Sequence, residues 1–331
     1  MTGDLPDGAR PGGGPADRAA GIGLALVAGA LLATQARING QLGGELGDGV
    51  LAALVSFASG LLILVLLAVA SPRLRAGLRA VRAAAVRRDL RWWQLIGGTS
   101  GAYLVACQGL TIGALGVAVF TVAVVAGQAV SGLVVDRAGL GPAGPQAITP
   151  ARVLTAVGAL AGVLVAVSGR LSAPDAVALA ALPLLAGVAL SWQQAVNGRV
   201  GAAAGGPMPA TLVNFAVGTA VLVVVSAVDL AVRGLPGGPP TTAWLYVGGS
   251  LGIPVVALGV VAVRRIGVLL MGMATVAGQI TAALLLDVLA PVAGRGPTAA
   301  EVLGCALALT VVVAAGVAGG RPARHGARMA P

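Results

Sequence analysis

Two pairs of side-chain amides stand out as polar residues within the apolar stretches of this 331-residue chain. Gln35 and Asn39 are four residues apart, as are Gln193 and Asn197, so each pair would lie on one face of a helix. Side-chain amides both donate and accept hydrogen bonds, and between helices they can line a polar pathway or form a gate. They can equally cap helix ends and tie neighbouring helices, with each Asn-Gly marking a turn. Both interpretations stay open for these four residues.

Gln128 and Gln279 occupy equivalent places near the middle of two other apolar stretches. Thr121, Gln128 and Ser131 form a polar stripe at spacings of seven and three, which keeps them on one side of a helix. An amide at mid-depth can bind a polar molecule without a charged side chain. A charged side chain at that depth would cost roughly 2.5–3.5 kcal/mol. The alternative is an interhelical hydrogen bond, worth under about 2 kcal/mol, and we favour ligand contact. Weaker candidates, for which ordinary packing is the alternative, are Tyr103, Trp192, Ser56 and Asn214.

Other kinds of site chemistry lack the residues that they need. Cys107 and Cys305 both fall in apolar stretches, so neither a disulfide framework nor a thiolate metal site is predicted. The only histidine, His325, lies in a polar tail, which excludes an embedded triad or a histidine metal ligand. The run G-T-S-G from Gly98 matches a motif of intramembrane serine proteases, but those enzymes need an embedded histidine base. We therefore expect no cofactor, no metal and no enzyme activity.

The composition indicates the class of protein that positions these residues. Hydrophobic residues make up 57% of the chain and charged residues only 10%, against about 25% in soluble domains. A helix of about 20 apolar residues crosses a bilayer, so the chain is predicted to be an all-α integral membrane protein. The ten predicted transmembrane helices are Gly21–Ile38, Val50–Ala70, Trp93–Ile112, Gly116–Val135, Arg152–Ser168, Ala176–Val196, Met208–Ala231, Ala243–Val263, Gly267–Asp287 and Ala299–Gly319.

An internal repeat divides the predicted spans into two halves. The sequence GALLATQARINGQLG (29–43) recurs 158 residues later as GVALSWQQAVNGRVG (187–201), with six of fifteen positions identical. Each copy holds five spans, and because five is odd, the second copy must enter the membrane upside down. The predicted architecture is therefore two inverted five-helix repeats.

A second repeated block supports the same division. AVVAGQ (123–128) recurs as ATVAGQ (274–279), and the same offset places Asp136 on Asp287. Both aspartates are predicted to end equivalent helices, where a structural role is expected. The predicted organisation is a disordered tail, two repeats and a second tail, at 1–19, 20–170, 171–319 and 320–331.

The arginines predict the orientation, because cytoplasmic loops are enriched in basic residues. All 21 basic residues are arginines. If the N-terminus lies in the cytoplasm, 17 of these arginines are on the cytoplasmic side of the membrane and four are on the outer side. Both termini are therefore predicted to be cytoplasmic, and the net charge of +10 is interpreted as a topology signal instead of a nucleic-acid surface. The segment Arg73–Arg91 is either an interfacial helix on anionic lipid or a solvated loop.

These features resemble a known group of transporters. Ten spans in two inverted five-helix repeats are similar to the drug/metabolite transporter superfamily. Two motifs narrow the resemblance to the YdcZ family of bacterial inner-membrane exporters, here with two copies fused. They are the doubled Q-x-x-x-N-G, beginning at Gln35 and Gln193, and V-A-G-Q followed eight residues later by Asp. The resemblance covers residues 20–319.

The resemblance implies a secondary transporter that exports small organic metabolites or drug-like compounds from a cavity between the two halves. Inverted repeats permit alternating access around a site near the membrane midplane. The expected partners are a small-molecule substrate and the lipid bilayer, not nucleic acid, and a homodimer is a further candidate. The alternative function is a non-transporting membrane scaffold or sensor, which predicts a dry interface between the halves.

Overall fold

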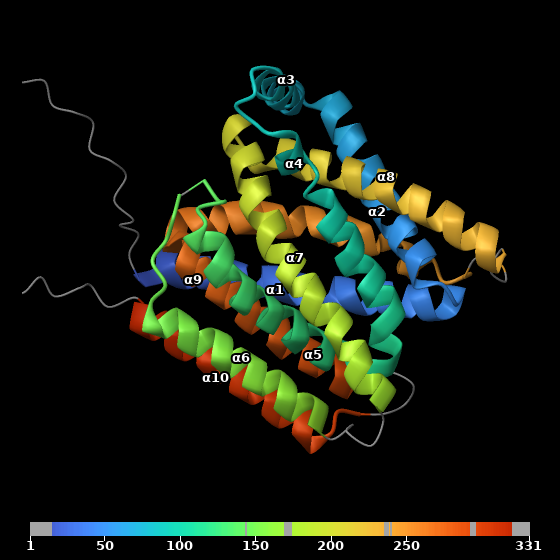
Figure 1. Ribbon diagram of the computed structural model, residues 1–331, viewed down its shortest axis with the longest axis vertical. Coiled ribbons are helices and arrows are strands. Elements are labelled where there is room, and N and C mark those ends of the chain that lie inside the picture. The colour runs from blue at the N-terminus through green and yellow to red at the C-terminus, as the bar shows by residue number, and fades with distance from the viewer. Residues whose placement is uncertain are drawn as a thin grey trace, which may run out of the picture.

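The computed structural model describes residues 15–142, 144–168, 174–234, 238, 240–291 and 296–319, and every regular element in these ranges is helical (Figure 1). The prediction of an all-α fold is therefore confirmed for this part of the chain. The first 14 residues and the predicted tail at 320–331 lie outside the described residues. The elements are α1 (Pro15–Leu46), α2 (Gly49–Ala70), α3 (Pro72–Val86), α4 (Trp92–Leu95), α5 (Gly98–Arg137), α6 (Pro150–Ser168), α7 (Pro174–Ala203), α8 (Pro207–Arg233), the 3₁₀ helix η1 (Ala243–Leu251), α9 (Gly252–Leu289) and α10 (Ala299–Gly319).

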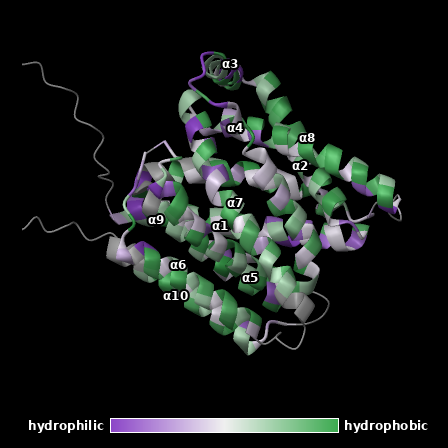
Figure 2. Ribbon diagram, viewed as in Figure 1, coloured by the Kyte–Doolittle hydropathy of each residue, from purple (hydrophilic) through white to green (hydrophobic). Residues whose placement is uncertain are grey.

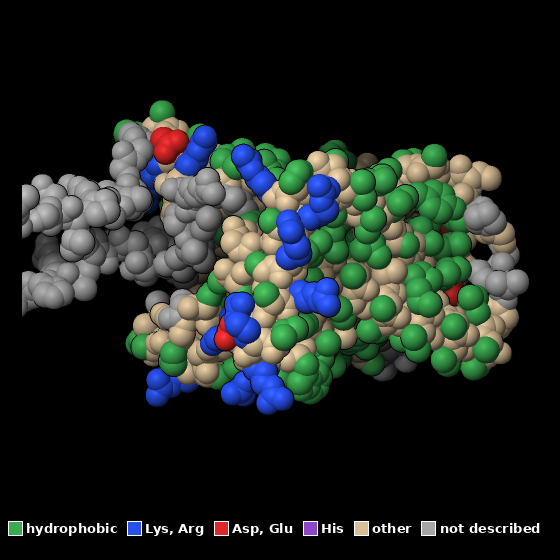
Figure 3. Space-filling view, turned by 90° about the horizontal axis from the view of Figure 1, so that it is seen from above, with side chains coloured by type: hydrophobic (Ala, Val, Ile, Leu, Met, Phe, Trp, Pro, Cys, Tyr) green, Lys and Arg blue, Asp and Glu red, His purple; other side chains and the backbone are tan. Residues whose placement is uncertain are grey.

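The outside of the molecule is apolar, as expected of a protein surrounded by lipid. Six helices are long and apolar enough to cross a membrane, and three shorter apolar helices accompany them. Leu66 on α2 and Val224 on α8 are 60% and 64% exposed, whereas Asn39 and Thr121 are fully buried. Figure 2 shows apolar residues along most of each long helix, and Figure 3 shows arginines on one side of a face that is otherwise largely hydrophobic. This distribution is the reverse of that in a soluble protein.

α1 is longer than the predicted first span, Gly21–Ile38, because it begins at Pro15 and continues to Leu46. Asn39-Gly40 therefore lies inside a helix, and so does Asn197-Gly198, because α7 continues to Ala203. The alternative in which each Asn-Gly marks a turn is wrong. The physical reason is that both asparagines bond to side chains of other helices instead of to their own backbone.

A single residue, Ser71, separates α2 from α3. The backbone N–H of Ser71 donates to the carbonyl of Leu67 and ends α2, while its Oγ accepts from the N–H of Leu74 at 3.2 Å and begins α3. Pro72 follows at the first helical position, where the missing N–H costs nothing. The first part of the basic segment is thus a helix that starts directly where α2 ends, while residues 87–91 form a loop after it.

α5 contains a break that folds it into two arms. Gly116 has φ of +78°, outside the helical region, and separates a first arm (98–115) from a second arm (117–137). Both arms run along α7 in opposite directions. A Cβ at Gly97 would lie 2.7 Å from Oδ1 of Asn197, and Nε of Arg199 donates to the carbonyl of Leu140 at 2.5 Å. The predicted third and fourth spans, Trp93–Ile112 and Gly116–Val135, largely overlap these two arms in sequence.

α9 folds back on itself in the same way, this time along α1. Near its start, a Cβ at Gly252 would lie 3.9 Å from Oε1 of Gln35. Just after its end, the carbonyl of Ala290 accepts from Arg37 at 2.6 Å. A straight 38-residue helix would hold its ends about 57 Å apart, yet both ends lie beside neighbouring residues of α1. Ile266, in the middle of α9, lies beside Gly21 near the start of α1, so the chain turns there. Leu270–Leu289, after this turn, is the second arm of α9.

Two of the very close helix contacts involve equivalent residues of the two repeats. A Cβ at Gly29 of α1 would clash with the carbonyl oxygen of Thr275 on α9. A Cβ at Gly187 of α7 would clash in the same way with the carbonyl oxygen of Val124 on α5. Gly29 and Gly187 are repeat equivalents, and so are Thr275 and Val124. Each half therefore packs its first helix on the second arm that belongs to the other half.

Candidate functional site

Asn39 and Gln108 form the first of two buried amide clusters, named here the Asn39 cluster. Asn39 is 0% exposed, and its Nδ2 donates to Oε1 of Gln108 at 2.7 Å, which ties α1 to the first arm of α5. Its own Oδ1 has no hydrogen-bond partner among the described residues. An unpaired buried amide oxygen costs about 1–3 kcal/mol. A Cβ at Gly248 would lie against this oxygen, so η1 closes the cluster from another side.

Gln193, Asn197 and Asn214 form the second cluster, named here the Asn214 cluster. Oδ1 of Asn214 on α8 accepts from Nε2 of Gln193 at 3.1 Å and from Nδ2 of Asn197 at 3.2 Å, both on α7. Oε1 of Gln193 has no hydrogen-bond partner among the residues that the structure describes. Gly97 lies beside Asn197 as Gly248 lies beside Asn39, and the two glycines are again repeat equivalents.

The two clusters lie at different levels along the first arm of α5. The Asn214 cluster is beside Gly97, which immediately precedes this arm, and the Asn39 cluster is at Gln108. Gly97 and Gln108 are eleven residues apart, which corresponds to about 16 Å along a helix. Four of the seven amides predicted from the sequence, Asn39, Gln193, Asn197 and Asn214, are thus divided between two levels of the molecule. Gln35 lies half-buried near the Asn39 cluster.

The clusters differ because the repeats differ at two positions. Asn214 has Ser56 as its repeat equivalent, and the shorter side chain of Ser56 does not bond to Gln35; its buried Oγ has no partner among the described residues. In the first half Gln108 is the partner of Asn39 instead. The second half has no counterpart to Gln108, because its repeat equivalent is Gly259. Gln108 was not predicted, because the repeat indicates only amides that recur in both halves. A search for single amides within predicted spans would have found it.

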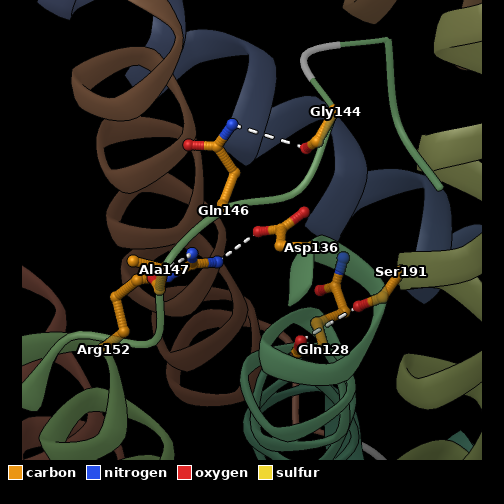
Figure 4. Close-up of polar contacts among 7 residues, drawn as sticks. All are labelled: Gln128, Asp136, Gly144, Gln146, Ala147, Arg152 and Ser191. Carbon is orange, nitrogen blue, oxygen red and sulfur yellow. Dashed lines mark hydrogen bonds and ion pairs between the residues drawn. The ribbon is translucent and has the colours of Figure 1, made fainter. Parts of the chain in front are cut away.

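Gln128 and Gln279 do not join either cluster. Both are half-buried on the second arms, and neither side-chain amide bonds to a described residue. Figure 4 shows Oγ of Ser191 bonded, at 2.9 Å, to the backbone carbonyl of Gln128 and not to its side chain. Thr121, one of the predicted stripe, is fully buried and its Oγ1 is also unpaired within the described ranges. The side chains of Gln128, Gln279 and Thr121 thus have unused hydrogen-bonding groups among the described residues.

Tyr103 and Trp192 lie half-buried on α5 and α7. The hydroxyl of Tyr103 donates to the carbonyl of Leu182 at 3.3 Å, one residue before Pro183, which interrupts the backbone hydrogen bonding of α7. Trp192 makes no polar side-chain contact with a described residue. Between α1, α5, α7 and α9 the centre is formed by apolar side chains that include Ala33, Phe120, Val124, Ala186 and Ala283.

The sequence predicted a structural role for Asp287 but not the helix that it contacts. It was predicted to serve its own helix end, but its carboxylate accepts from the N–H groups of Val117 at 3.1 Å and Ala118 at 2.7 Å. These are the first two residues of the second arm of α5, after the break at Gly116. A carboxylate at a helix N-terminus satisfies free N–H groups and favours the helix dipole. Asp287 is 6% exposed, so this contact is buried.

Asp136, the repeat equivalent of Asp287, is held differently. Its carboxylate pairs with the guanidinium of Arg152 at the start of α6, and both side chains are partly exposed (Figure 4). Its backbone carbonyl accepts from the N–H of Gln146 at 2.8 Å. The prediction of a structural role at a helix end agrees with these contacts. The two aspartates thus stabilise different joints in the two halves.

Comparison with known proteins agrees with the duplication. The family model described as "Putative inner membrane exporter, YdcZ" matches residues 20–165 and, a second time, residues 178–314. No curated protein is a significant match. A crystal structure of a protein is similar over 92% of this chain and 97% of its own length, at 18% identity with a TM-score of 0.55. At that identity the similarity concerns the fold alone. Each matched region of the family model contains one of the two amide clusters.

Proposed function

This chain belongs to the YdcZ family of inner membrane exporters, and on that premise we propose that it is a secondary transporter that exports small organic metabolites or drug-like compounds by alternating access. It is a multi-pass membrane protein, and membership of an exporter family favours transport over enzymatic activity. The observation that carries the mechanism is the exchange of equivalent contacts between the halves. Gly97 meets Asn197, and Gly248 meets Asn39.

An arrangement of ten spans in two inverted repeats accounts for that exchange. Trp92–Arg137 is a 46-residue apolar stretch, about 69 Å if straight and twice the hydrocarbon thickness of about 30 Å. Counting its two arms as two spans, and adding the three shorter apolar helices, brings the six long helices to ten. Two such halves, each packed on the other, can adopt either of two equivalent conformations, which is the basis of alternating access.

We propose that both ends of the chain lie in the cytoplasm. Figure 1 shows the start of α1 and the end of α10 at the same side of the molecule, which an even number of spans requires. The arginines of α3 and the loop after it, together with Arg137, Arg152 and Arg199, belong to the cytoplasmic side in this arrangement.

The two amide clusters serve as gates in this proposal, the Asn214 cluster toward the cytoplasm and the Asn39 cluster toward the outside. Both are hydrogen-bonded in the structure, which corresponds to a closed conformation. Opening one gate would free its amides for the substrate while the other stayed bonded. Between the gates, four polar side chains of the central helices are uncharged, namely Tyr103, Thr121, Gln128 and Gln279. A substrate that carries hydrogen-bonding groups without net charge suits this lining.

Transport is tested by measuring flux of a panel of metabolites and drug-like compounds in proteoliposomes. We expect saturable flux of at least one uncharged polar compound. If folded protein transports no compound and cysteines placed beside Gln128 are labelled from neither side, the interface is dry, and the scaffold or sensor alternative replaces this proposal.

Replacing both Gln128 and Gln279 by Leu should lower flux at least tenfold while the protein still inserts and folds. The reason is that these amides bond to no described side chain, so their loss removes contacts to the substrate and few contacts within the protein. Gln194→Leu is the matched control, because Gln194 is an exposed glutamine on α7. Flux equal to that of the control would show that the two residues do not line the pathway.

Replacing Gln108 by Leu should weaken the outer gate, because both polar groups of the buried Asn39 amide are then unpaired. We expect a loss of stability of about 1 kcal/mol, typical of an interhelical hydrogen bond in a membrane, and altered flux. A double variant with Asn39→Leu should cost less than the sum of the single variants. Strict additivity of the two losses would mean that the hydrogen bond contributes nothing to the gate.

A further inference from the structure

α3 and the loop that follows it form a basic surface at the depth of the lipid headgroups. The lipid-exposed surface of α2 continues to Val69, which is 71% exposed, and α3 starts only three residues later. α2 has 22 residues, about 33 Å of helix, and this already spans a hydrocarbon core of about 30 Å. The headgroup layer extends only about 5–8 Å further, so α3 lies within it.

The other end of this surface is marked by a tryptophan. Trp92, which begins α4, is 74% exposed, and Trp side chains favour the boundary between headgroups and hydrocarbon. Val86, the last residue of α3, is 76% exposed. Exposed apolar residues at both ends of α3 would be unfavourable in cytosol and are favourable at a membrane interface.

α3 has one face on the protein and leaves its arginines outside. Leu74, Gly77, Val81 and Ala84 are buried at a spacing of three or four residues, and a Cβ at Gly77 would lie 2.5 Å from Pro209 of α8. This face fixes the helix against α7 and α8. All seven arginines between Pro72 and Arg91 are exposed. Figure 3, which views the molecule from the side of α3, shows arginines gathered on this face. The cation surface is therefore held in place by packing that does not involve the charges.

The arginines greatly exceed the acids on this surface. Seven arginines stand against one carboxylate, Asp89, which pairs with Arg87 at 2.9 Å. Arg75 donates to the last carbonyls of α2, Ala68 and Val69. Arg73, Arg79 and Arg82 have no hydrogen bond or ion pair with any described residue. Guanidinium groups bind phosphate oxygens with paired hydrogen bonds.

We propose that this surface, Pro72 to Trp92, binds the phosphate groups of anionic phospholipids in the cytoplasmic leaflet. Charge and depth together select this partner: a nucleic acid or an acidic protein would meet the charge but not the exposed Val86 and Trp92. Each arginine near an anionic membrane surface contributes roughly a fivefold gain in affinity. The bound lipids would hold α3, and through it the start of α8, at a fixed depth.

The test titrates short-chain phosphatidylglycerol into the full-length protein in neutral detergent and counts bound lipid by native mass spectrometry. Replacing Arg73, Arg79 and Arg82 together by Gln should weaken binding on the order of a hundredfold. The matched control replaces Arg321, Arg324 and Arg328 by Gln, the same change in charge elsewhere in the chain, and should leave binding within about twofold. Equal binding by the wild type and the α3 variant, or equal loss in both variants, would overturn the proposal.

Two further measurements test whether the bound phosphate belongs to a lipid and whether the surface lies at the bilayer. Inorganic phosphate or RNA that competes as well as phosphatidylglycerol would show a soluble anion site instead of a lipid site. In bilayers that contain brominated phosphatidylglycerol, we expect bromines near the headgroup to quench more Trp fluorescence in the wild type than in Trp92→Phe. The same quenching in both proteins would mean that α3 stands away from the bilayer.

Discussion

Replacing Asp287 by Ala is expected to destabilise the protein by about 3–5 kcal/mol and to abolish transport. The substitution leaves the buried N–H groups of Val117 and Ala118 without their acceptor, and each such loss to a charged partner costs about 1.5–3 kcal/mol. The second arm of α5 begins at these residues, directly after the break at Gly116. Thermal unfolding in detergent and flux in proteoliposomes measure the two effects.

Asp136→Ala is the matched control, because it removes the repeat-equivalent carboxylate. Its ion pair with Arg152 is partly exposed, and a partly exposed pair contributes at most about 1 kcal/mol. Asp287→Asn, which keeps one acceptor oxygen, should fall between the wild type and the alanine variant. Equal destabilisation by Asp287→Ala and Asp136→Ala would contradict the assignment of Asp287 as the cap of α5.

Replacing Gly29 by Val should cost about 3 kcal/mol or more, because two helix backbones would have to separate. A Cβ there meets the carbonyl oxygen of Thr275 and lies 2.6 Å from the backbone nitrogen of Gln279. Neither atom belongs to a flexible side chain, so rotamer changes cannot relieve the clash. We expect a lower melting temperature and reduced yield of folded protein after membrane extraction.

Gly23→Val supplies the comparison on the same helix. A Cβ at Gly23 has nothing within 4 Å, while the β-branched side chain imposes the same change in helix propensity. The difference between the two variants therefore isolates the contact between α1 and α9. Gly187→Val, the repeat equivalent, should behave like Gly29→Val, since it meets the carbonyl oxygen of Val124. If only one of the two glycines is sensitive, the halves do not contribute equivalent contacts.

These predictions concern the same structural feature, the exchange of arms between the halves. α1 with the second arm of α9, and α7 with the second arm of α5, are joined by backbone contacts too close for a side chain. Each pair should move as one unit. The amide clusters, which consist of side-chain hydrogen bonds, can separate at lower cost.

The sequence alone was sufficient for the membrane class, the helical content and the family. Whether a segment enters a bilayer depends on the summed transfer energies of its own residues. The duplication is visible because equivalent residues such as Asn39 and Asn197 keep their spacing in both copies. The helix boundaries were less accurate: Asn-Gly was compatible with a turn, and only the packing of its side chain shows why α1 continues.

The tertiary structure decided which residues meet. Asn39 bonds to Gln108, 69 residues away in the chain, and Asp287 caps Val117, 170 residues away. Such pairings cannot be predicted from local composition, because they depend on how whole helices pack after they have inserted into the membrane. The sequence determined that the two aspartates are equivalent in position, and only packing made one of them a buried cap and the other a partly exposed ion pair.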